Sequence, residues 1–384
     1  MKLFISFAKW ITILCIIGIA AIYLFDINYL VKAVRVTYFT GHKTAFLEDY
    51  HYFSNREIKN GTAIEWPKAK TYNKVTPTQK LERTHKELRT TSFLIIKNDS
   101  IWHESYYDIG SQTSKTNSFS MAKSIVTTAL GIAIDQQIIP SLDTKVIDYL
   151  PELKGTFANE VTVGDLASMS SGQKWREDYY GPFSITTQAY FRTNLRDFML
   201  DLPIESQPGQ QFIYQSGDTQ LLAKVLEKAT KTTLADFVSK NLWQPLGMEQ
   251  SALWQTDQED NGIEKAYCCI ASNARDFSKI GSLYLHKGNW KGKQILSESF
   301  VDISTKPRFE KSPQYGYGFW LTNYRQKKIY YMRGHLGQFV ILIPEDQLII
   351  TRLGHLKGLQ TETDPHSEDL YVYIDETYEM LKAK

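Results

Sequence analysis

The most constraining feature of this sequence is that strand signals lie at both ends of the folded body, with helical signals between them. An apolar run at 92–97 and an aromatic run at 100–107 flank the dipeptide Asn98-Asp99, which predicts a β-hairpin. Four later runs rich in aromatic or β-branched residues are also predicted strands: 317–322, 328–332, 338–343 and 348–353. The economical fold is one antiparallel sheet assembled from both ends of the chain.

Helical periodicity fills most of the remaining body. Ile125, Ala129, Ile132 and Ala133 recur at helical spacing and predict a long helix over 121–136, and further helices are expected at 218–230, 276–286 and 367–382. We therefore predict an α+β fold, in which an α/β sandwich with an antiparallel sheet carries an inserted, mainly helical domain. The expected division is 1–25 as an anchor or signal sequence, 26–90 as a connecting segment, 91–137 with 311–384 as the sheet domain, and 138–310 as the helical domain.

Composition narrows the function class. With 384 residues, 42% hydrophobic and 22% charged, the chain is an ordinary globular protein of two or three domains. A net charge of +2 argues against nucleic acid as a partner. Three cysteines make no disulfide framework, and a bridge between the neighbours Cys268 and Cys269 would be strained and rare. No HExxH or Cys/His spacing indicates a metal, and no cofactor is expected.

The N-terminus carries an apolar run over 3–25. Residues 10–25 alone would give about 24 Å of helix, and snorkelling of Lys9 extends the reach toward a bilayer core of about 30 Å. Lys2 and Lys9 precede the run, which favours a cytoplasmic N-terminus and an uncleaved transmembrane anchor. A cleaved signal peptide, suggested by Gly18-Ile19-Ala20, and a buried core helix are the alternatives.

Ser120 and Lys123 form a Ser-x-x-Lys motif. The same pattern occurs at Ser6 and Ser171, but only Ser120 opens a long apolar helix. A serine there could simply cap the helix, although a capping box would want Glu or Gln at 123. A lysine in the first turn would instead feel the positive end of the helix dipole, which lowers the pKa of its amine as a catalytic base requires. From this motif alone both interpretations stay open.

Two later motifs carry side chains that could act with a serine. Tyr214-Gln215-Ser216 precedes a predicted helix, where the phenol could relay a proton if nearby cations lower its pKa. The segment 333–338, which contains Gly334, His335 and Gly337, lies between two predicted strands, and its glycines allow close backbone approach to a ligand. A core tyrosine and a surface hairpin turn are the structural alternatives.

A pair of acids, Glu177-Asp178, lies in the predicted helical block. Paired carboxylates suggest glycoside hydrolysis. Adjacent acids rarely converge on one bond, so a solvated loop is the favoured interpretation.

Taken in order, Ser-x-x-Lys, Tyr-x-Ser and His-x-Gly resemble the serine β-lactamase and penicillin-binding protein superfamily. The chain is most similar to its class C and esterase-like branch, and within that to the 6-aminohexanoate-dimer hydrolases. Further matching stretches at 118–124, 149–153, 169–172 and 274–276 extend the resemblance over roughly two-thirds of the chain.

The resemblance implies a role for each matching residue. Ser120 would be the acylated nucleophile, Lys123 its base and Tyr214 the proton relay, while His335 would occupy the third motif. The backbone N–H groups of Ser120 and Gln338, beside Gly337, would form the oxyanion hole. Tyr179 would hydrogen-bond the scissile group, with Tyr180 as the alternative match.

Two departures from the pattern bear on the substrate. Ser216 stands where β-lactamases usually carry Asn, and His335 replaces a fixed cation. Both favour a small ester or amide over a β-lactam. We therefore predict a serine hydrolase of a bacterial inner membrane, attached by its N-terminal helix and exposed on the periplasmic side, or secreted after signal cleavage. The alternatives are a cell-wall D-amino-acid peptidase or β-lactamase-like enzyme, and a non-catalytic sensor.

Overall fold

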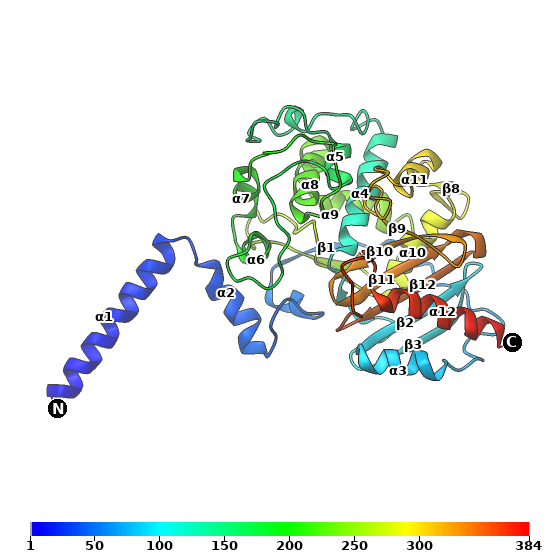
Figure 1. The fold of residues 1–384 in the computed structure, drawn as a ribbon, viewed down its shortest axis with the longest axis horizontal. Coiled ribbons are helices and arrows are strands. Elements are labelled where there is room, and N and C mark those ends of the chain that lie inside the picture. Colours follow the sequence, from blue (N-terminus) through cyan, green and yellow to red (C-terminus); the bar gives the residue numbers. More distant parts are fainter. Residues whose placement is uncertain (1, 384) are drawn as a thin grey trace.

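The computed structural model describes residues 2–383, and its centre is a six-stranded antiparallel sheet (Figure 1). The strand order is β3-β2-β12-β11-β10-β9, with bounds β2 Thr90–Lys97, β3 Ser100–Tyr106, β9 Trp320–Tyr324, β10 Lys327–Gly334, β11 Gln338–Ile343 and β12 Leu348–Gly354. Strand β12 pairs with β2 and places Ile350 opposite Ile95. This pairing confirms the prediction that one sheet is built from both ends of the chain.

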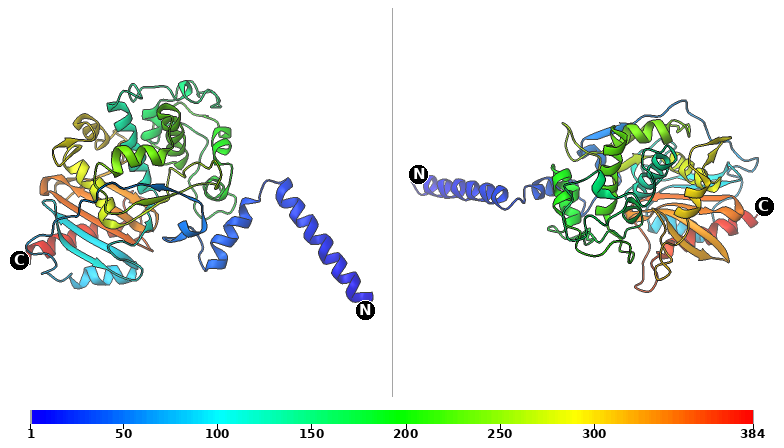
Figure 2. Two further views of the ribbon diagram at one scale, coloured as in Figure 1. Left: turned by 180° about the vertical axis from the view of Figure 1, so that it is seen from behind. Right: turned by 90° about the horizontal axis from the view of Figure 1, so that it is seen from above.

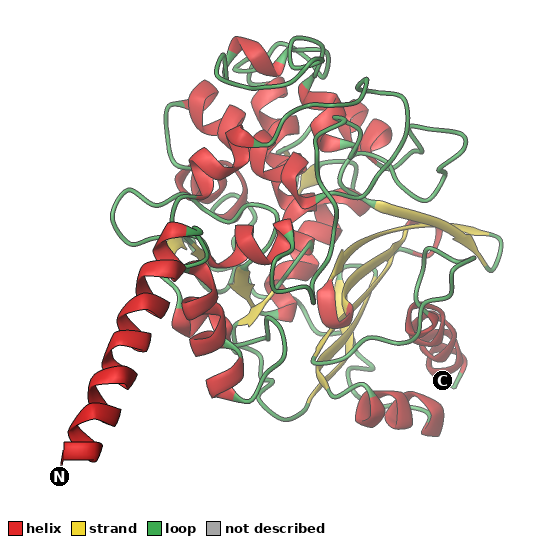
Figure 3. Ribbon diagram, turned by 60° about the vertical axis from the view of Figure 1, so that its left-hand side comes forward, coloured by secondary structure: helices red, strands yellow, loops and turns green. Residues whose placement is uncertain are grey.

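Each face of this sheet is covered by helices (Figure 3). Phe93 and Ile95 pack with α3 (Gln79–Glu87) and α12 (Glu368–Lys382), whereas the alternate residues Leu94 and Ile96 belong to the core on the α10 (Ala274–Leu285) side. Because both faces are buried, β2 is almost continuously apolar rather than alternating. Helix α3 was not expected, since residues 26–90 were predicted to be only a connecting segment.

The helical region lies beside the sheet and is organised around α4 (Met121–Asp135), which contacts both α8 (Ser216–Thr230) and β10. The other helices here are α5 Val163–Ala167, α6 Ile185–Phe191, α7 Leu195–Asp201, α9 Leu234–Val238, η4 Ser239–Trp243 and α11 Glu298–Ser304. The expected division at residue 310 assigns α10 to this region, whereas α10 packs against β11 and β12 of the sheet. Periodicity located α10 but carried no information about its partner.

A second, four-stranded sheet has the order β1-β5-β6-β4. Its strands are β1 Asn55–Ile58, β4 Thr116–Asn117, β5 Ala252–Gln255 and β6 Ile270–Ser272. The sheet ties the predicted connecting segment, through β1, to the helical region, through β5. Strands of two to four residues are too short to show a period in sequence.

The remaining short elements are η1 Tyr38–Thr40, η2 Asp49–Tyr52, η3 Val146–Asp148, η5 His335–Gly337, η6 Pro344–Asp346, and the hairpin β7 Asn289–Trp290 with β8 Lys293–Gln294. Cys268 and Cys269 form a disulfide, which corrects the expectation that these neighbours stay unbridged. Cys269 has a left-handed backbone (φ 77°), so the chain turns between the two residues.

At the N-terminus, α1 (Lys2–Leu24) projects away from the body and α2 (Tyr29–Val36) returns to it (Figures 1 and 2). Large apolar side chains of α1 are exposed, among them Phe4, Phe7 and Trp10. Within 2–383, no helix taken singly has the length and apolar character needed to cross a bilayer. The stretches 9–24 and 29–40 meet that criterion only as a pair, with a bend of 107° between them.

Candidate active site

Ser120 stands at the start of α4 in a tightly held turn. The residue before it, Phe119, has a left-handed backbone (φ 44°), and the Asn117 side chain accepts a hydrogen bond from the Phe119 N–H at 2.8 Å. Ser120 occupies the N-cap position, yet its side chain makes no capping hydrogen bond. Its Oγ instead accepts a hydrogen bond from Lys123 Nζ at 2.9 Å. This contact favours the chemical interpretation of the motif over simple helix capping.

Lys123 is buried, with 2% of its surface exposed. Its Nζ also donates to the Tyr267 carbonyl at 2.8 Å and lies 5.1 Å from the centre of the Tyr214 ring. Burial lowers the pKa of Lys123 to about 8, and the Glu177 carboxylate partly opposes the shift. The direction is the expected one, but burial rather than the helix end is the main cause. A sizeable fraction of this amine is neutral near pH 8.

Tyr214 precedes α8, and Ser120 lies near enough to its hydroxyl to influence the pKa of the phenol. Burial, and then the charge of Glu177, raise the pKa of Tyr214 above its usual value. The sequence-based prediction of a pKa lowered by nearby cations was wrong, because burial and the Glu177 carboxylate outweigh the opposing effect of Arg333. The phenol therefore stays protonated near neutral pH and is suited to donate a proton.

Glu177 is the acidic residue of this region that the sequence analysis undervalued. It accepts hydrogen bonds from the Ser216 N–H (2.8 Å), the Ser216 hydroxyl (2.6 Å) and Trp175 Nε1 (2.6 Å). A carboxylate at the N-terminus of α8 is also favoured by the helix dipole. Asp178 instead accepts from the N–H groups of Tyr180 and Gly181 within its own turn. The two acids thus have separate hydrogen-bond partners, and both the N–H and the hydroxyl of Ser216 bind Glu177.

His335 meets two aromatic side chains beside Ser120. Its ring centre lies 5.0 Å from that of Tyr179 and 5.6 Å from that of Phe119. Burial, aided by Lys357 and Arg333, lowers the pKa of His335 to about 4, so the imidazole is neutral at physiological pH. Within the described part of the chain, its Nε2 has no hydrogen-bond partner.

Both tyrosines of the 179–180 pair reach the same cavity, with different exposure. Tyr180 is 69% exposed, whereas Tyr179 is half-buried and lies near Glu177. Burial and the Glu177 charge raise the pKa of Tyr179. The more enclosed setting of Tyr179 favours it over Tyr180 as the residue that contacts a substrate.

The turn that carries Gly337 and Gln338 is held by Arg352, a buried residue that the sequence analysis missed. Arg352 Nη1 donates to the carbonyls of Leu336 (2.9 Å) and Gly337 (2.8 Å). The Gln338 side chain donates to the His335 carbonyl at 3.0 Å. Since the C=O and N–H of a trans peptide point in opposite directions, the Gln338 N–H faces away from Arg352. A single arginine inside the apolar run of β12 was the available signal.

Close backbone approach, for which glycine is needed, occurs at Gly334. A Cβ atom on Gly334 would lie 2.2 Å from the Ser118 carbonyl oxygen, two residues before Ser120. Gly337, with φ 80°, approaches Arg352 instead. The role of the Ser120 and Gln338 N–H groups as an oxyanion hole stays a prediction.

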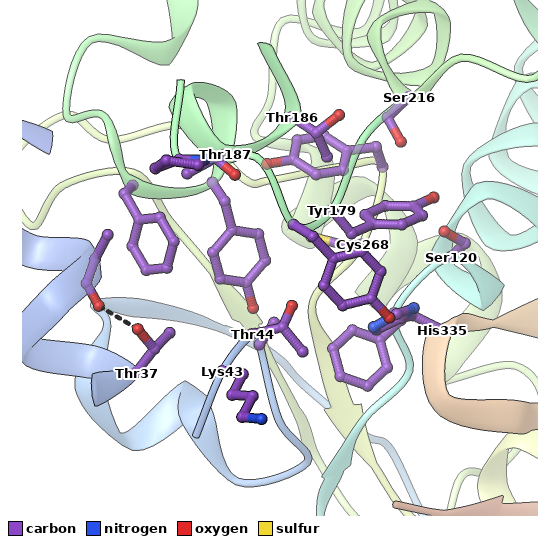
Figure 4. A pocket seen from close by; sticks show the side chains of 18 of the residues that line it. Thr37, Lys43, Thr44, Ser120, Tyr179, Thr186, Thr187, Ser216, Cys268 and His335 are labelled. Atoms are coloured by element: carbon purple, nitrogen blue, oxygen red, sulfur yellow. Dashed lines mark hydrogen bonds between the residues drawn. The ribbon is translucent and has the colours of Figure 1, made fainter. Parts of the chain in front are cut away.

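A cavity of about 210 Å³ adjoins Ser120 (Figure 4). Ser120, Tyr179, Ser216 and His335 line it together, which brings four predicted site residues from separate parts of the chain to one place. Gly337 and Gln338 do not reach its wall. Over residues 2–383, no group of three or more His, Cys, Asp or Glu side chains is arranged to hold a metal ion.

Known proteins match the chain over most of its folded body. The profile of the family described as Beta-lactamase matches residues 78–369. A 6-aminohexanoate-dimer hydrolase of Paenarthrobacter ureafaciens is 27% identical over 234 residues, which are 58% of this chain and 58% of that protein. A lovastatin esterase of Penicillium rubens is 25% identical over 165 residues, 36% of this chain and 40% of that protein. The chain therefore matches less than two-thirds of the length of either relative.

Solved structures show the same fold. A Bacillus anthracis protein assigned provisionally as a 6-aminohexanoate-dimer hydrolase superposes with a TM-score of 0.71 at 21% identity, covering 87% of this chain and 91% of that one. The D-amino acid amidase of Ochrobactrum anthropi superposes with a TM-score of 0.59 at 16% identity, covering 78% of this chain and 96% of that one.

Proposed function

The chain belongs to the beta-lactamase family, and within that family we propose that it is a serine hydrolase that cleaves a small ester or amide through an acyl-enzyme on Ser120. The observation that carries the proposal is the 2.9 Å contact between Ser120 Oγ and the buried Lys123 amine. Its matched relatives, which are described as a dimer hydrolase and an esterase, support hydrolysis as the reaction class.

The first half-reaction begins with the neutral Lys123 amine, which accepts the Ser120 hydroxyl proton as Oγ attacks the substrate carbonyl carbon. Backbone N–H groups, proposed to be those of Ser120 and Gln338, stabilise the oxyanion. The bond from the carbonyl carbon to the leaving oxygen or nitrogen then breaks. The leaving group takes a proton from Tyr214, whose raised pKa keeps the phenol protonated for this step.

The second half-reaction releases the acid. A water molecule attacks the acyl-enzyme carbonyl carbon and gives up one proton to the Tyr214 phenolate. The Lys123 ammonium returns its proton to Oγ as the Oγ–carbonyl bond breaks, which restores the serine hydroxyl and the neutral amine. Tyr179 borders the cavity beside His335 and is proposed to hydrogen-bond the scissile group.

The proposed substrate lacks the carboxylate that a β-lactam carries. Ser216, in place of an amide side chain, already donates its hydroxyl to Glu177. His335, in place of a fixed cation, has a pKa of about 4 and is neutral at physiological pH, so it offers no charge to a substrate carboxylate. These features weigh against the β-lactamase and D-amino-acid peptidase alternatives.

The proposal is tested by running p-nitrophenyl esters, short amides, 6-aminohexanoate dimer and nitrocefin against wild type and Ser120→Ala in parallel. Intact-mass analysis with a fluorophosphonate probe reports the Ser120 adduct. Turnover of an ester or amide that Ser120→Ala loses, with nitrocefin left intact, is the expected result. Absence of a Ser120 adduct would contradict the catalytic assignment, and a long-lived adduct formed from a substrate would indicate the sensor alternative.

We further propose that α1 attaches the protein to a membrane, with the catalytic body on the extracytoplasmic side. The exposed apolar side chains of α1 and its position away from the body support attachment. Fractionation of the full-length chain tests the proposal. Retention in the pellet after alkaline carbonate washing is expected, and release into the soluble fraction with the N-terminus intact would overturn it.

A further inference from the structure

One wall of the cavity beside Ser120 comes from a segment that precedes the matched family region. We call residues 29–45 the N-terminal wall; this segment contains α2 and the loop after η1. Leu30, Ala33 and Val34 of α2 line the cavity together with Thr44. The family match begins only at residue 78, so this wall lies outside the matched region. In Figure 4, the wall residues Thr37, Lys43 and Thr44 lie toward the left and bottom of the cavity, and Ser120 and His335 lie on its right side.

Hydrogen bonds attach the N-terminal wall firmly to the body at both of its ends. The Tyr29 hydroxyl donates to the Pro182 carbonyl at 3.2 Å, on the far side of the cavity. Beyond the loop, the Asn117 N–H donates to the Leu47 carbonyl at 2.8 Å. The Asn117 side chain donates to the buried Asp49 carboxylate at 3.0 Å. Asn117 is also the residue that orients the turn before Ser120, so the wall and the nucleophile share one support.

The cavity is lined mainly by apolar, aromatic and threonine side chains and carries almost no charge. Against the three apolar side chains of α2 stand Tyr190 and Phe191 of α6, and no carboxylate lines the space between them. Lys43, which is exposed, is the one lysine or arginine among the residues that line it. An ammonium or carboxylate group placed between α2 and α6 would lose its hydration without gaining a partner of opposite charge, whereas methylene groups would be favoured beside the apolar side chains of α2 and α6.

Building on the function proposed above, we propose that the N-terminal wall forms an acyl-chain site, and that the substrate is an ester or amide of an unbranched aliphatic acid. The chain lies between α2 and α6 with its carbonyl carbon at Ser120. Ser120 Oγ bonds to that carbon, the bond to the alcohol or amine breaks, and the leaving group takes up one proton. Water then releases the aliphatic acid and restores Ser120.

The test compares two substitutions on the same helix. Ala33→Phe fills the cavity, whereas Val31→Phe adds the same ring to an exposed position of α2 outside it. The probes are p-nitrophenyl acetate, butyrate and octanoate, together with fluorophosphonates that carry a methyl or an octyl group. Phosphonylation forms an Oγ–P bond at Ser120 and releases fluoride, so it reports chain binding without requiring turnover.

In wild type, we expect both kcat/KM and the Ser120 labelling rate to rise with chain length. Ala33→Phe is expected to lower the octanoate and octyl rates about tenfold or more while the acetate and methyl rates stay within about twofold, because filling an apolar site removes methylene binding. Val31→Phe should leave all rates near wild type. Leu30→Ala, which enlarges the site, provides a second variant should Ala33→Phe fail to fold, and it should raise the octyl-to-methyl ratio.

Each other outcome has a definite meaning. Equal effects of Ala33→Phe on short and long probes, or no effect of Ala33→Phe and Leu30→Ala, would overturn the acyl-chain site while leaving Ser120 as the nucleophile. Absence of Ser120 labelling by every probe in wild type would instead reject the serine hydrolase proposal itself.

Discussion

Two of the buried lysines, Lys123 and Lys265, differ in their surroundings, and only Lys123 has neighbours suited to a catalytic group. Lys123 at the start of α4 and Lys265 under the N-terminal segment are both buried, and burial lowers the pKa of each. Lys123 has a hydroxyl at 2.9 Å and a carbonyl at 2.8 Å. Lys265 Nζ has no hydrogen-bond partner within 2–383 and lies 3.5 Å from the centre of the Phe53 ring.

The difference teaches that a buried, partly neutral amine is not by itself a sign of catalysis. Lys265 lies near the buried carboxylate of Asp49 and between the aromatic rings of Phe53 and Tyr190, where it contributes to packing of the N-terminal segment on the body. Lys123 differs because its amine contacts the Ser120 hydroxyl and lies 5.1 Å from the centre of the Tyr214 ring, beside a cavity that Ser120 lines. The geometry of the neighbours decides the role.

The largest expected effect comes from the same substitution at the two lysines. Lys123→Met removes the proposed base and should lower the rate of ester or amide hydrolysis by about 10³-fold or more. The loss is large because Ser120 cannot act as a nucleophile without a group that accepts its proton. Lys265→Met, which replaces an amine without hydrogen bonds by a chain of similar shape, should leave kcat/KM within about threefold. Steady-state kinetics, with thermal unfolding as the check on folding, measures both. Comparable losses of activity in the two variants would contradict a catalytic role for Lys123 that Lys265 does not share.

A second test concerns the phenol beside Lys123. Tyr214→Phe keeps the ring over the amine but removes the proton donor, and should lower kcat by about 10²–10⁴-fold. The loss should be smaller for p-nitrophenyl esters than for amides, because p-nitrophenolate leaves without protonation. An equal loss on both substrate types would argue that the hydroxyl only positions Ser120.

In the region around Lys265, we expect a substitution of the neighbouring Asp49 to change the stability of the fold rather than the activity. Asp49 accepts hydrogen bonds from Tyr190, Gln255 and Asn117 side chains at 2.6, 2.8 and 3.0 Å. Asp49→Ala leaves buried donors unpaired and should lower the free energy of unfolding by about 2–4 kcal/mol, measured by urea denaturation. Asp201→Ala, which removes an exposed carboxylate paired with exposed Lys154, should change it by less than about 0.5 kcal/mol. Similar values for both variants would contradict the structural role of Asp49.

The smallest expected effect is a shift in pH dependence. The base must be a neutral amine, so kcat/KM should rise with pH until it levels off above the Lys123 pKa of about 8. Glu177 raises that pKa, and Glu177→Gln should move the rising limb to lower pH by less than about one unit. A limb that moves to higher pH would contradict the assignment, and circular dichroism controls for the altered start of α8.

Several elements could be predicted from the sequence because their signals are local. The run 338–343 coincides with β11, and the spacing of apolar residues located α4 and α8 within a residue or two. Ser120 and Lys123 lie one helical turn apart, so their contact follows once the helix is known. The short strand β1 and the helix α2 gave no comparable signal, because brief or isolated elements depend on partners far away in the chain.

Two residues near the candidate site, Glu177 and Arg352, were missed in the sequence because their interactions depend on their position in the fold rather than on residue type. Glu177 looked like part of a solvated loop, and its effect on Lys123 and Tyr214 arises only where the 175–179 loop meets the start of α8. Arg352 is one charged residue in an apolar strand, and its five hydrogen bonds go to groups that are distant in sequence or across a turn.

The sequence by itself determined the order of the main elements, the joining of both chain ends in one sheet, and the pairing of Ser120 with Lys123, because hydrophobic period and helical spacing are local properties. Only after folding is Lys123 buried beside the cavity, does burial keep the Tyr214 phenol protonated, and does the N-terminal wall line the space next to Ser120. Burial and electrostatic environment depend on segments that meet only after folding, so no local pattern encodes them.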